Sequence, residues 1–333
     1  MIVVYVNSNP CTLGEQHGAT IVRKRLGADE TIPPGAVWID LIDPTVEEDR
    51  KVEGFIGGTV PTKSDPDYTE PLEAHYAENG ARYMTATLMC HSDSEVPRTT
   101  AVTFILAGHR LTTVRYDEPK PFTIVGARLS RQCPTTVSGE SVMMDLLDAV
   151  IDRAADILEK IGSEVDAASH DILEPEGGAD RTRSFKEILK TIGRKGDQTS
   201  KVRESLVSIG RLLLYLATEA DAAKWAKDQR ATLKGMQRDV QSLSDHATYL
   251  SGKISFLLDA MLGVVSLEQN NIIKIFSVFA VVLTPPILIA SIYGMNFKHM
   301  PELEFEYAYP LAILLMVLAG IVPYFFFKWM KWL

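Results

Sequence analysis

Neutral oxygen donors lie in a short segment between two long apolar runs near the C-terminal end of the chain. Gly294, Met295 and Asn296 follow the first run, and Glu302 comes shortly after them. Glycine lets the backbone turn sharply and expose carbonyl groups, and asparagine adds an uncharged amide oxygen. Mg²⁺ gives up its water reluctantly. The segment is therefore suited to holding a hydrated divalent cation, with Glu302 at its outer mouth drawing cations in.

Polar side chains recur at every seventh position along the first apolar run. They are Asn270, Ser277, Thr284 and Ser291. Because polar groups facing lipid are costly, a line of them predicts the lining of a water-filled path. A single Ser or Thr in a membrane helix often bonds its own backbone or a neighbouring helix instead, but four in one register favour a pore.

Apolar residues complete the predicted lining. Ile273 and Ile287 are expected to face the same path as the polar line. With Phe276, Ile273 could form a gate that opens by wetting, or these side chains could simply pack. Pro285 and Pro286 kink the middle of the run and free two carbonyl groups, which could face the path or mark a packing kink.

The two apolar runs are each long enough to cross a bilayer as a helix. We assign 272–293 to a pore-lining transmembrane helix, 294–307 to the loop that carries the oxygen donors, and 308–327 to a second transmembrane helix. A basic tail, 328–333, follows. One pair of spans cannot enclose a pore, so several copies must surround a common axis.

Basic residues set the expected orientation. Lys253 and Lys274 lie before or at the start of the first span, and Lys328 and Lys331 follow the second, whereas the loop between the spans is acidic. The positive-inside tendency places both termini of the expected multi-pass protein in the cytoplasm. We expect the membrane to be the bacterial inner membrane. Tyrosines and tryptophans at the ends of the spans are expected to anchor them at the interfaces.

A long helical stalk is predicted ahead of the spans, over 137–271. Apolar residues from 233 to 261 alternate spacings of three and four, which is a heptad-like seam. Without a proline or clear stop before the membrane, one helix from about Asp221 to Tyr293 would measure about 100 Å. Further helices are expected over 141–173 and 181–217.

The first part of the chain, 1–136, reads as a cytoplasmic α/β domain. Short runs rich in β-branched residues predict strands at 1–6, 36–42, 83–90 and 100–108. Asp43-Pro44-Thr45 followed by Glu47 and Glu48 indicates a helix start. The fold class is thus α+β: an N-terminal α/β domain, a long stalk and a two-helix transmembrane hairpin.

Composition excludes some functions. The formal charge of −9 argues against nucleic-acid binding, which needs cationic contacts to phosphate. The three cysteines are scattered, which argues against a disulfide framework. Cys90 and His91 are adjacent on an expected strand and would point to opposite faces, so a buried thiol beside a solvated imidazole is expected rather than a zinc site.

The motif around Asn296 resembles the signature of the CorA-type magnesium transporter family. That signature is a Gly-Met-Asn triplet closing the first of two C-terminal spans, here Gly294-Met295-Asn296, followed by Met300-Pro301-Glu302-Leu303. The similarity extends through Glu268-Gln269-Asn270-Asn271 and the second span, and it fits the layout of the whole chain.

The resemblance implies a homopentamer with a funnel-shaped cytoplasmic domain, embedded in a lipid bilayer. It implies Mg²⁺ influx, with Co²⁺ and Ni²⁺ as further cargo, and gating by intracellular Mg²⁺ bound at acidic sites between subunits. Asp259 matches a family acid by its spacing from Asn270, and Asp239 and Asp245 lie on the same stalk. Mg²⁺ is then both cargo and regulator, and no catalytic cofactor is expected.

Two alternatives remain open at this point. A zinc transporter of the same architecture would share every feature above, although no His/Cys cluster suits zinc. A membrane-anchored enzyme or sensor is the other, but the sequence has no P-loop, no GxSxG and no HExxH motif. We therefore expect a channel and not an enzyme.

Overall fold

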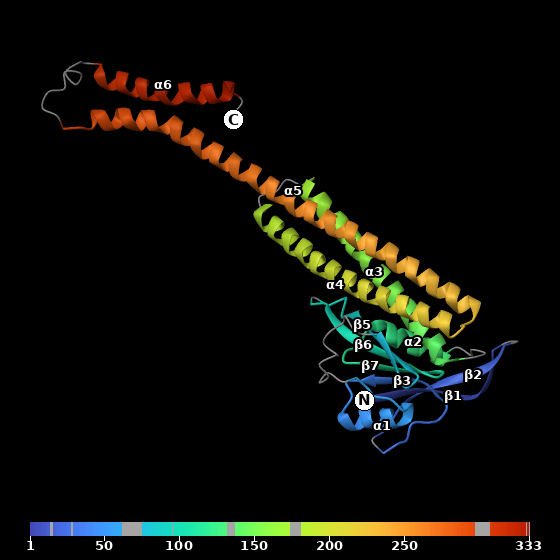
Figure 1. The fold of residues 1–333 in the computed structure, drawn as a ribbon. Helices are drawn as coiled ribbons and strands as arrows, with labels where there is room; N and C mark the ends of the chain where they lie inside the picture. The colour runs from blue at the N-terminus through green and yellow to red at the C-terminus, as the bar shows by residue number, and fades with distance from the viewer. Residues whose placement is uncertain are drawn as a thin grey trace. The chain divides into compact units, whose positions relative to one another are not determined.

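The computed structural model describes residues 1–13, 16–27, 29–61, 75–94, 96–131, 137–173, 181–296, 307–330 and 332. The chain divides into two compact units, which we call unit 1, Met1–Leu257, and unit 2, Leu258–Leu333. The long helix α5, Lys227–Tyr293, contributes residues to both units. The predicted α+β class, with a mixed sheet, long helices and a C-terminal pair of apolar helices, is confirmed (Figure 1).

A seven-stranded sheet forms the N-terminal part of unit 1. Its strands are β1 (Ile2–Leu13), β2 (Gln16–Arg25), β3 (Ala36–Ile42), β4 (His75–Glu78), β5 (Ala81–Cys90), β6 (Arg98–Ala107) and β7 (Arg110–Arg115). The order across the sheet is β2-β1-β3-β7-β6-β5-β4, and only the β3–β7 pair is parallel. The four predicted strands are all present, while β2, β4 and β7 were not predicted.

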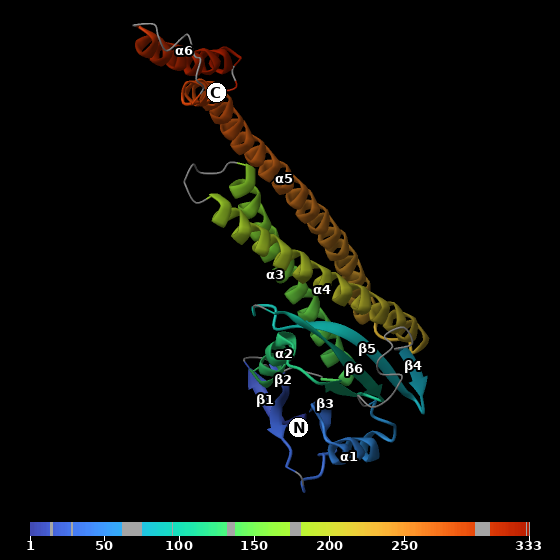
Figure 2. The same cartoon turned by 90° about the vertical axis from the view of Figure 1, so that its left-hand side faces the viewer.

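Helix α1, Val46–Ile56, lies against one face of the sheet (Figure 2). Thr45 caps it as the sequence indicates: its side chain accepts from the Glu48 N–H, and the Glu48 carboxylate accepts from the Thr45 N–H. Val52 of α1 is fully buried in an apolar cluster that includes Ile39 and Val114 of the sheet. This cluster forms the apolar core between α1 and one face of the sheet.

Two further helices cover the opposite face. Helix α2, Lys120–Arg131, was not predicted, and it buries Phe122 close to Trp38 of β3. Helix α3, Gly139–Leu173, starts directly on the β6–β7 turn, where the Gly139 N–H donates to the His109 carbonyl. A Cβ at 139 would lie 2.4 Å from the Arg110 carbonyl carbon, so only glycine allows this approach. The first turn of α3 is thereby held in close contact with the β6–β7 turn of the sheet.

A buried ion pair joins the two parallel strands. The Arg115 guanidinium donates to the Asp40 carboxylate through Nε, which contacts both oxygens, and through Nη2, and the Thr113 hydroxyl donates to the same carboxylate. All three side chains are buried. Because each polar group has a partner, strand β7 can carry charged and hydroxyl residues in the core without leaving unsatisfied groups.

Helices α3, α4 (Arg181–Ala222) and the first part of α5 pack into a bundle within unit 1 (Figure 1). The expected seam of α5 is buried there, apart from the half-buried Leu243. Its buried members in unit 1 are Leu233, Met236, Val240, Ala247, Leu250, Ile254 and Leu257. Lys253 of α5 pairs with Asp166 of α3, and Lys195 of α4 pairs with Glu164 of α3. The predicted helices over 141–173 and 181–217 are confirmed, with slightly wider bounds.

The prediction that one helix starts near Asp221 was wrong. Asp221 belongs to α4, and α5 starts at Lys227 after a short break. The break is closed by a hydrogen bond from the Trp225 N–H to the Ala220 carbonyl, with Lys224 in the left-handed region at φ 54°. This is a helix-ending motif in which glycine is the usual residue, and the absence of glycine hid it in the sequence.

Candidate ion path

Unit 2 contains two helices that are long and apolar enough to cross a membrane. They are the second part of α5 and α6, Ala308–Trp329, and each has a window of mean hydropathy 2.3. Tyr307, Tyr309 and Trp329 at the ends of α6 are well exposed, as expected for interfacial anchors. Most side chains over 272–293 and 308–329 are exposed, several are half-buried, and Val278 is buried at 6%. Their surroundings therefore have to come from outside this subunit.

The polar line of α5 lies away from α6. The α5 positions that are buried or half-buried in unit 2 include Val278, Val282, Pro285 and Ile289, which share one side of the helix. At 3.6 residues per turn, the polar line is rotated from that side by about 120°. Its four members, Asn270, Ser277, Thr284 and Ser291, are all exposed. The hairpin leaves this line free to face water or other copies of the chain.

The apolar residues assigned to the lining are exposed as well. Ile273, Phe276 and Ile287 are 60%, 71% and 59% exposed. In the part of the chain that the structure describes, these side chains are mostly uncovered, so the packing alternative for Ile273 and Phe276 needs further partners.

The hydroxyl of Thr284 is held by its own backbone. It donates to the Ala280 carbonyl one turn earlier, at 2.6 Å. The bond satisfies the hydroxyl proton and leaves the oxygen lone pairs free to accept. A cation or its hydration water needs such an acceptor, so this local bond is compatible with a role in a cation path.

Helix α5 ends where the oxygen donors begin. The Gly294 N–H donates to the Ala290 carbonyl at 3.0 Å, and the Met295 N–H donates to the Ile292 carbonyl at 3.2 Å. These two bonds close the last turn, so the carbonyls that follow have no helical partner to the C-terminal side. Gly294, Met295 and Asn296 are exposed. Glu302 lies outside the described residues.

The proline break faces α6 rather than the polar line. Pro286 has no N–H to donate to the carbonyl of Val282. That carbonyl oxygen lies 3.7 Å from the place that a Cβ on Gly320 of α6 would occupy. The geometry therefore favours a packing role for this freed carbonyl over exposure in a lumen.

The three acids proposed as regulators are separate within one subunit. Asp239, Asp245 and Asp259 are all exposed on α5. Asp245 accepts a hydrogen bond from Gln241, and Asp239 approaches the acidic flank of α3. Burial raises the pKa of Asp148 on α3, and the nearby charges of Asp152 and Asp239 raise it further. Within the described residues, no group of three or more His, Cys, Asp or Glu side chains could hold a metal ion.

The Cys90 thiol is buried beside an exposed His91 ring, as expected, but the prediction that both residues lie on one strand was wrong: β5 ends at Cys90, and His91 follows it in the left-handed region at φ 52°. The Cys90 thiol is buried, and burial raises its pKa to about 12. The exposed His91 ring instead pairs with the Asp117 carboxylate at 2.9 Å. The two side chains do not form a zinc site.

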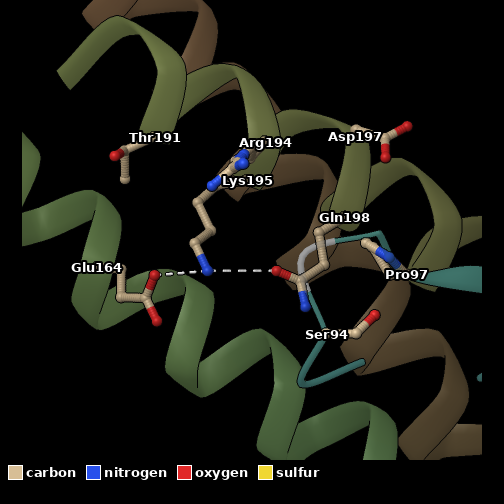
Figure 3. A pocket seen from close by; sticks show the side chains of 8 residues that line it. All are labelled: Ser94, Pro97, Glu164, Thr191, Arg194, Lys195, Asp197 and Gln198. Carbon is tan, nitrogen blue, oxygen red and sulfur yellow. Dashed lines mark hydrogen bonds and ion pairs between the residues drawn. The ribbon is translucent and has the colours of Figure 1, made fainter. Parts of the chain in front are cut away.

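A cavity of about 230 Å³ in unit 1 lies outside the predicted path (Figure 3). Lys195 reaches across it to the Glu164 carboxylate at 2.5 Å and to the Gln198 amide oxygen at 3.4 Å. Arg194 and Asp197 add one charge of each sign. Because its charges are balanced and Glu164 is engaged, the cavity offers no free cation ligand set.

Two features of the helices were missed by the sequence analysis. One is Gly320, the close-approach point of α6 on α5. The other is a pair of exposed aromatic residues on α5 in unit 1, Tyr249 and Phe256, each 61% exposed. Tyr249 and Phe256 have a spacing signal, because they occupy the same heptad position as the polar line. Gly320 has none, because the residues three and four positions away from it are larger: Met316, Val317, Pro323 and Tyr324.

Known proteins resemble this chain over nearly its whole length. The "Magnesium transport protein CorA" of Pasteurella multocida (strain Pm70) is 33% identical over 298 residues, covering 90% of this chain and 92% of that protein.

Two solved structures share the fold. The complete CorA magnesium transporter from Methanocaldococcus jannaschii matches with TM-score 0.75 and 18% identity, covering 100% of this chain and 99% of that one. The ZntB cytoplasmic domain from Vibrio parahaemolyticus RIMD 2210633 matches with TM-score 0.56 and 10% identity, covering 80% of this chain and 98% of that one.

The profile of the family described as "CorA-like Mg2+ transporter protein" matches residues 34–329. With the profile match and the curated relative both covering most of the sequence, the chain belongs to the CorA-like Mg²⁺ transporter family.

Proposed function

We propose that this chain forms an oligomeric channel that admits Mg²⁺ across the inner membrane, with α5 lining the pore. The observation that carries the proposal is the exposed polar line of Asn270, Ser277, Thr284 and Ser291, turned away from α6. A polar line facing lipid would be costly, and a shared aqueous axis satisfies it. Family membership supports Mg²⁺ as the cargo.

The selectivity filter is proposed at the end of α5. Copies arranged around an axis would present a ring of Asn296 amide oxygens and the backbone carbonyls near Gly294. Neutral oxygens attract a hydrated cation without trapping it, which conduction requires. Because Mg²⁺ keeps its inner water shell, Asn296 would bind those waters rather than the bare ion. Glu302 would raise the cation concentration at the outer mouth.

Self-association is supported by a second seam on α5. Tyr249 and Phe256 lie one heptad apart on the side of α5 that its own bundle leaves exposed. Large exposed aromatic side chains in heptad register are typical of a helix–helix contact. We propose that they meet their counterparts in a homopentamer, the assembly implied by the family resemblance. Both termini would lie in the cytoplasm.

Regulation by cytoplasmic Mg²⁺ is proposed at acids shared between subunits. Asp239, Asp245 and Asp259 are exposed and lack a complete ligand set within one subunit. A cation bridging such acids with those of a neighbour would neutralise their repulsion and hold the subunits in a closed, symmetric state. Removing Mg²⁺ would release the carboxylates and favour opening.

Mg²⁺ flux into proteoliposomes of the purified full chain tests the proposal. Uptake is expected without Mg²⁺ on the cytoplasmic side and should fall when it is present there. Asn296→Ala should abolish uptake while the oligomer stays intact by size-exclusion chromatography. Normal uptake by that variant would refute the filter assignment. Faster uptake of Zn²⁺ than of Mg²⁺, Co²⁺ or Ni²⁺ in the same vesicles would favour a zinc transporter instead.

A further inference from the structure

Gly320 is the point where α6 approaches the proline break of α5. A Cβ built at position 320 would lie 3.5 Å from Cγ of Pro286 and 3.7 Å from the carbonyl oxygen of Val282. Gly320 is half-buried, whereas Val322, two residues further along α6, is 63% exposed. The backbone of α6 thus lies close to α5 at a glycine and not at a larger residue.

The contact falls on the weakest part of α5. Pro285 and Pro286 each remove a hydrogen bond from the helix, so the carbonyls of Val281 and Val282 lose their usual donors. A helix that lacks consecutive hydrogen bonds bends readily, and its bend is set by what packs against it. Pro323 of α6 is also half-buried, on the same side as Gly320. Both helices therefore meet where their own backbone bonding is interrupted.

The same turn of α5 carries a member of the polar line. Thr284 lies between Val282 and Pro286 in the sequence but faces away from α6. Any change in the bend at the prolines therefore moves the Thr284 hydroxyl relative to the rest of the line. We propose that Gly320 is a positioning residue for ion conduction: by seating α6 in the proline break, it sets the place of Thr284 on the proposed pore.

The geometry predicts which side chains position 320 tolerates. Distances of 3.5 and 3.7 Å are ordinary van der Waals contacts, so the single methyl of alanine fits without movement. The additional side-chain atoms of leucine would overlap with the Pro286 ring and the Val282 carbonyl oxygen. The two helices would then have to move apart, or α5 would have to change its bend. Gly320→Ala is therefore the conservative variant and Gly320→Leu the disruptive one.

The test compares Mg²⁺ uptake kinetics of full-length Gly320→Leu, Gly320→Ala and the control Val322→Leu in proteoliposomes. In the proposed channel, ions are captured at Asn296, ten residues beyond Pro286 in the sequence. Gly320→Leu should therefore lower the maximal rate about tenfold and leave the apparent affinity unchanged. Gly320→Ala and Val322→Leu should both behave like the wild type. Equal maximal rates for Gly320→Leu and Val322→Leu would overturn the inference, as would a loss confined to apparent affinity.

Rescue distinguishes a specific contact from general damage. Pro286→Ala removes the ring that Leu at position 320 would strike, while Pro285 keeps the break. Gly320→Leu combined with Pro286→Ala should recover most of the lost rate. If Gly320→Leu does not assemble, the same recovery is scored on assembly. No recovery on either measure would overturn the inference.

The inference rests on the proposed channel function, and different results would refute the channel and the role of Gly320. Wild-type vesicles that take up no Mg²⁺ would overturn both. Wild-type uptake that is unaffected by Gly320→Leu would overturn only the role of Gly320.

Discussion

Units 1 and 2 bury their side chains by different means. In unit 1 the chain supplies its own partners, and Leu250 on α5 is 2% exposed. In unit 2 the continuation of the same helix leaves most of its side chains exposed, including Phe276 at 71%. The core of unit 1 is therefore complete within one subunit, whereas in our proposal unit 2 is completed by lipid and by other copies.

The largest expected effect contrasts two neighbours on α5 within unit 1. Leu250→Ala removes a fully buried side chain and should lower the free energy of unfolding by about 3 kcal/mol. Tyr249→Ala removes an exposed one and should change the stability of the subunit by less than about 0.5 kcal/mol. Instead it should weaken the oligomer. Chemical denaturation and size-exclusion chromatography measure the two effects separately.

Equal loss of subunit stability in both variants would break the comparison, because it would place Tyr249 in the core of its own subunit. An unchanged oligomer in Tyr249→Ala would remove the support for a second seam.

A buried acid in α1 gives unit 1 a pH dependence of its own. Asp49 is 6% exposed and one of its carboxylate oxygens has no hydrogen-bond partner within the described residues. Burial, with Glu53 and Glu48 nearby, raises its pKa to about 6. Since an unfolded aspartate titrates near 3.9, the protonated acid is favoured in the folded state, and stability is lost as the pH rises through about 6.

Asp49→Asn should remove that loss. It should stabilise the protein by about 2 kcal/mol at pH 8 and by almost nothing at pH 4. Thermal unfolding of the two proteins across this range measures the difference. A constant difference at all pH values would show that Asp49 titrates normally.

The smallest expected effect lies in unit 2. Thr284→Val keeps the shape of the side chain and removes the hydroxyl, so Mg²⁺ uptake should fall roughly tenfold with no change in assembly. Leu283→Val alters a neighbour that is not on the polar line and should leave uptake unchanged. Flux in proteoliposomes is the measurement. If Leu283→Val is the more harmful substitution, the polar line does not face the ion path.

The sequence was most informative where the spacing or length of apolar residues alone indicates what surrounds a helix. Both membrane helices were predicted because an apolar run of about 20 residues is typical of a bilayer span and rare elsewhere. The seam of α5 was predicted because spacings of three and four are typical of a helix packed along one side. The role of Gly294, Met295 and Asn296 as oxygen donors stays a prediction, and the structure adds that they are exposed at the end of α5.

The elements that we did not predict contain residues that are unusual for a strand, a helix or a helix end, and that are explained by contacts with distant parts of the chain. Strand β7 reads as polar because Thr113 and Arg115 are buried through bonds to Asp40, which no local pattern reveals. Helix α2 contains Gly126, whose Cβ would lie 2.3 Å from the Tyr5 hydroxyl, so packing required a residue that weakens the helical signal. The end of α4 at Lys224 likewise lacks the usual glycine.

The most direct test of the central claim asks whether the polar line faces water. Single cysteines would replace Ser277 or Phe279 in full-length protein whose own three cysteines are changed to serine. A charged, membrane-impermeant thiol reagent should block Mg²⁺ flux through Ser277→Cys and leave Phe279→Cys unaffected. Block of Phe279→Cys alone would place the line against lipid and contradict the channel.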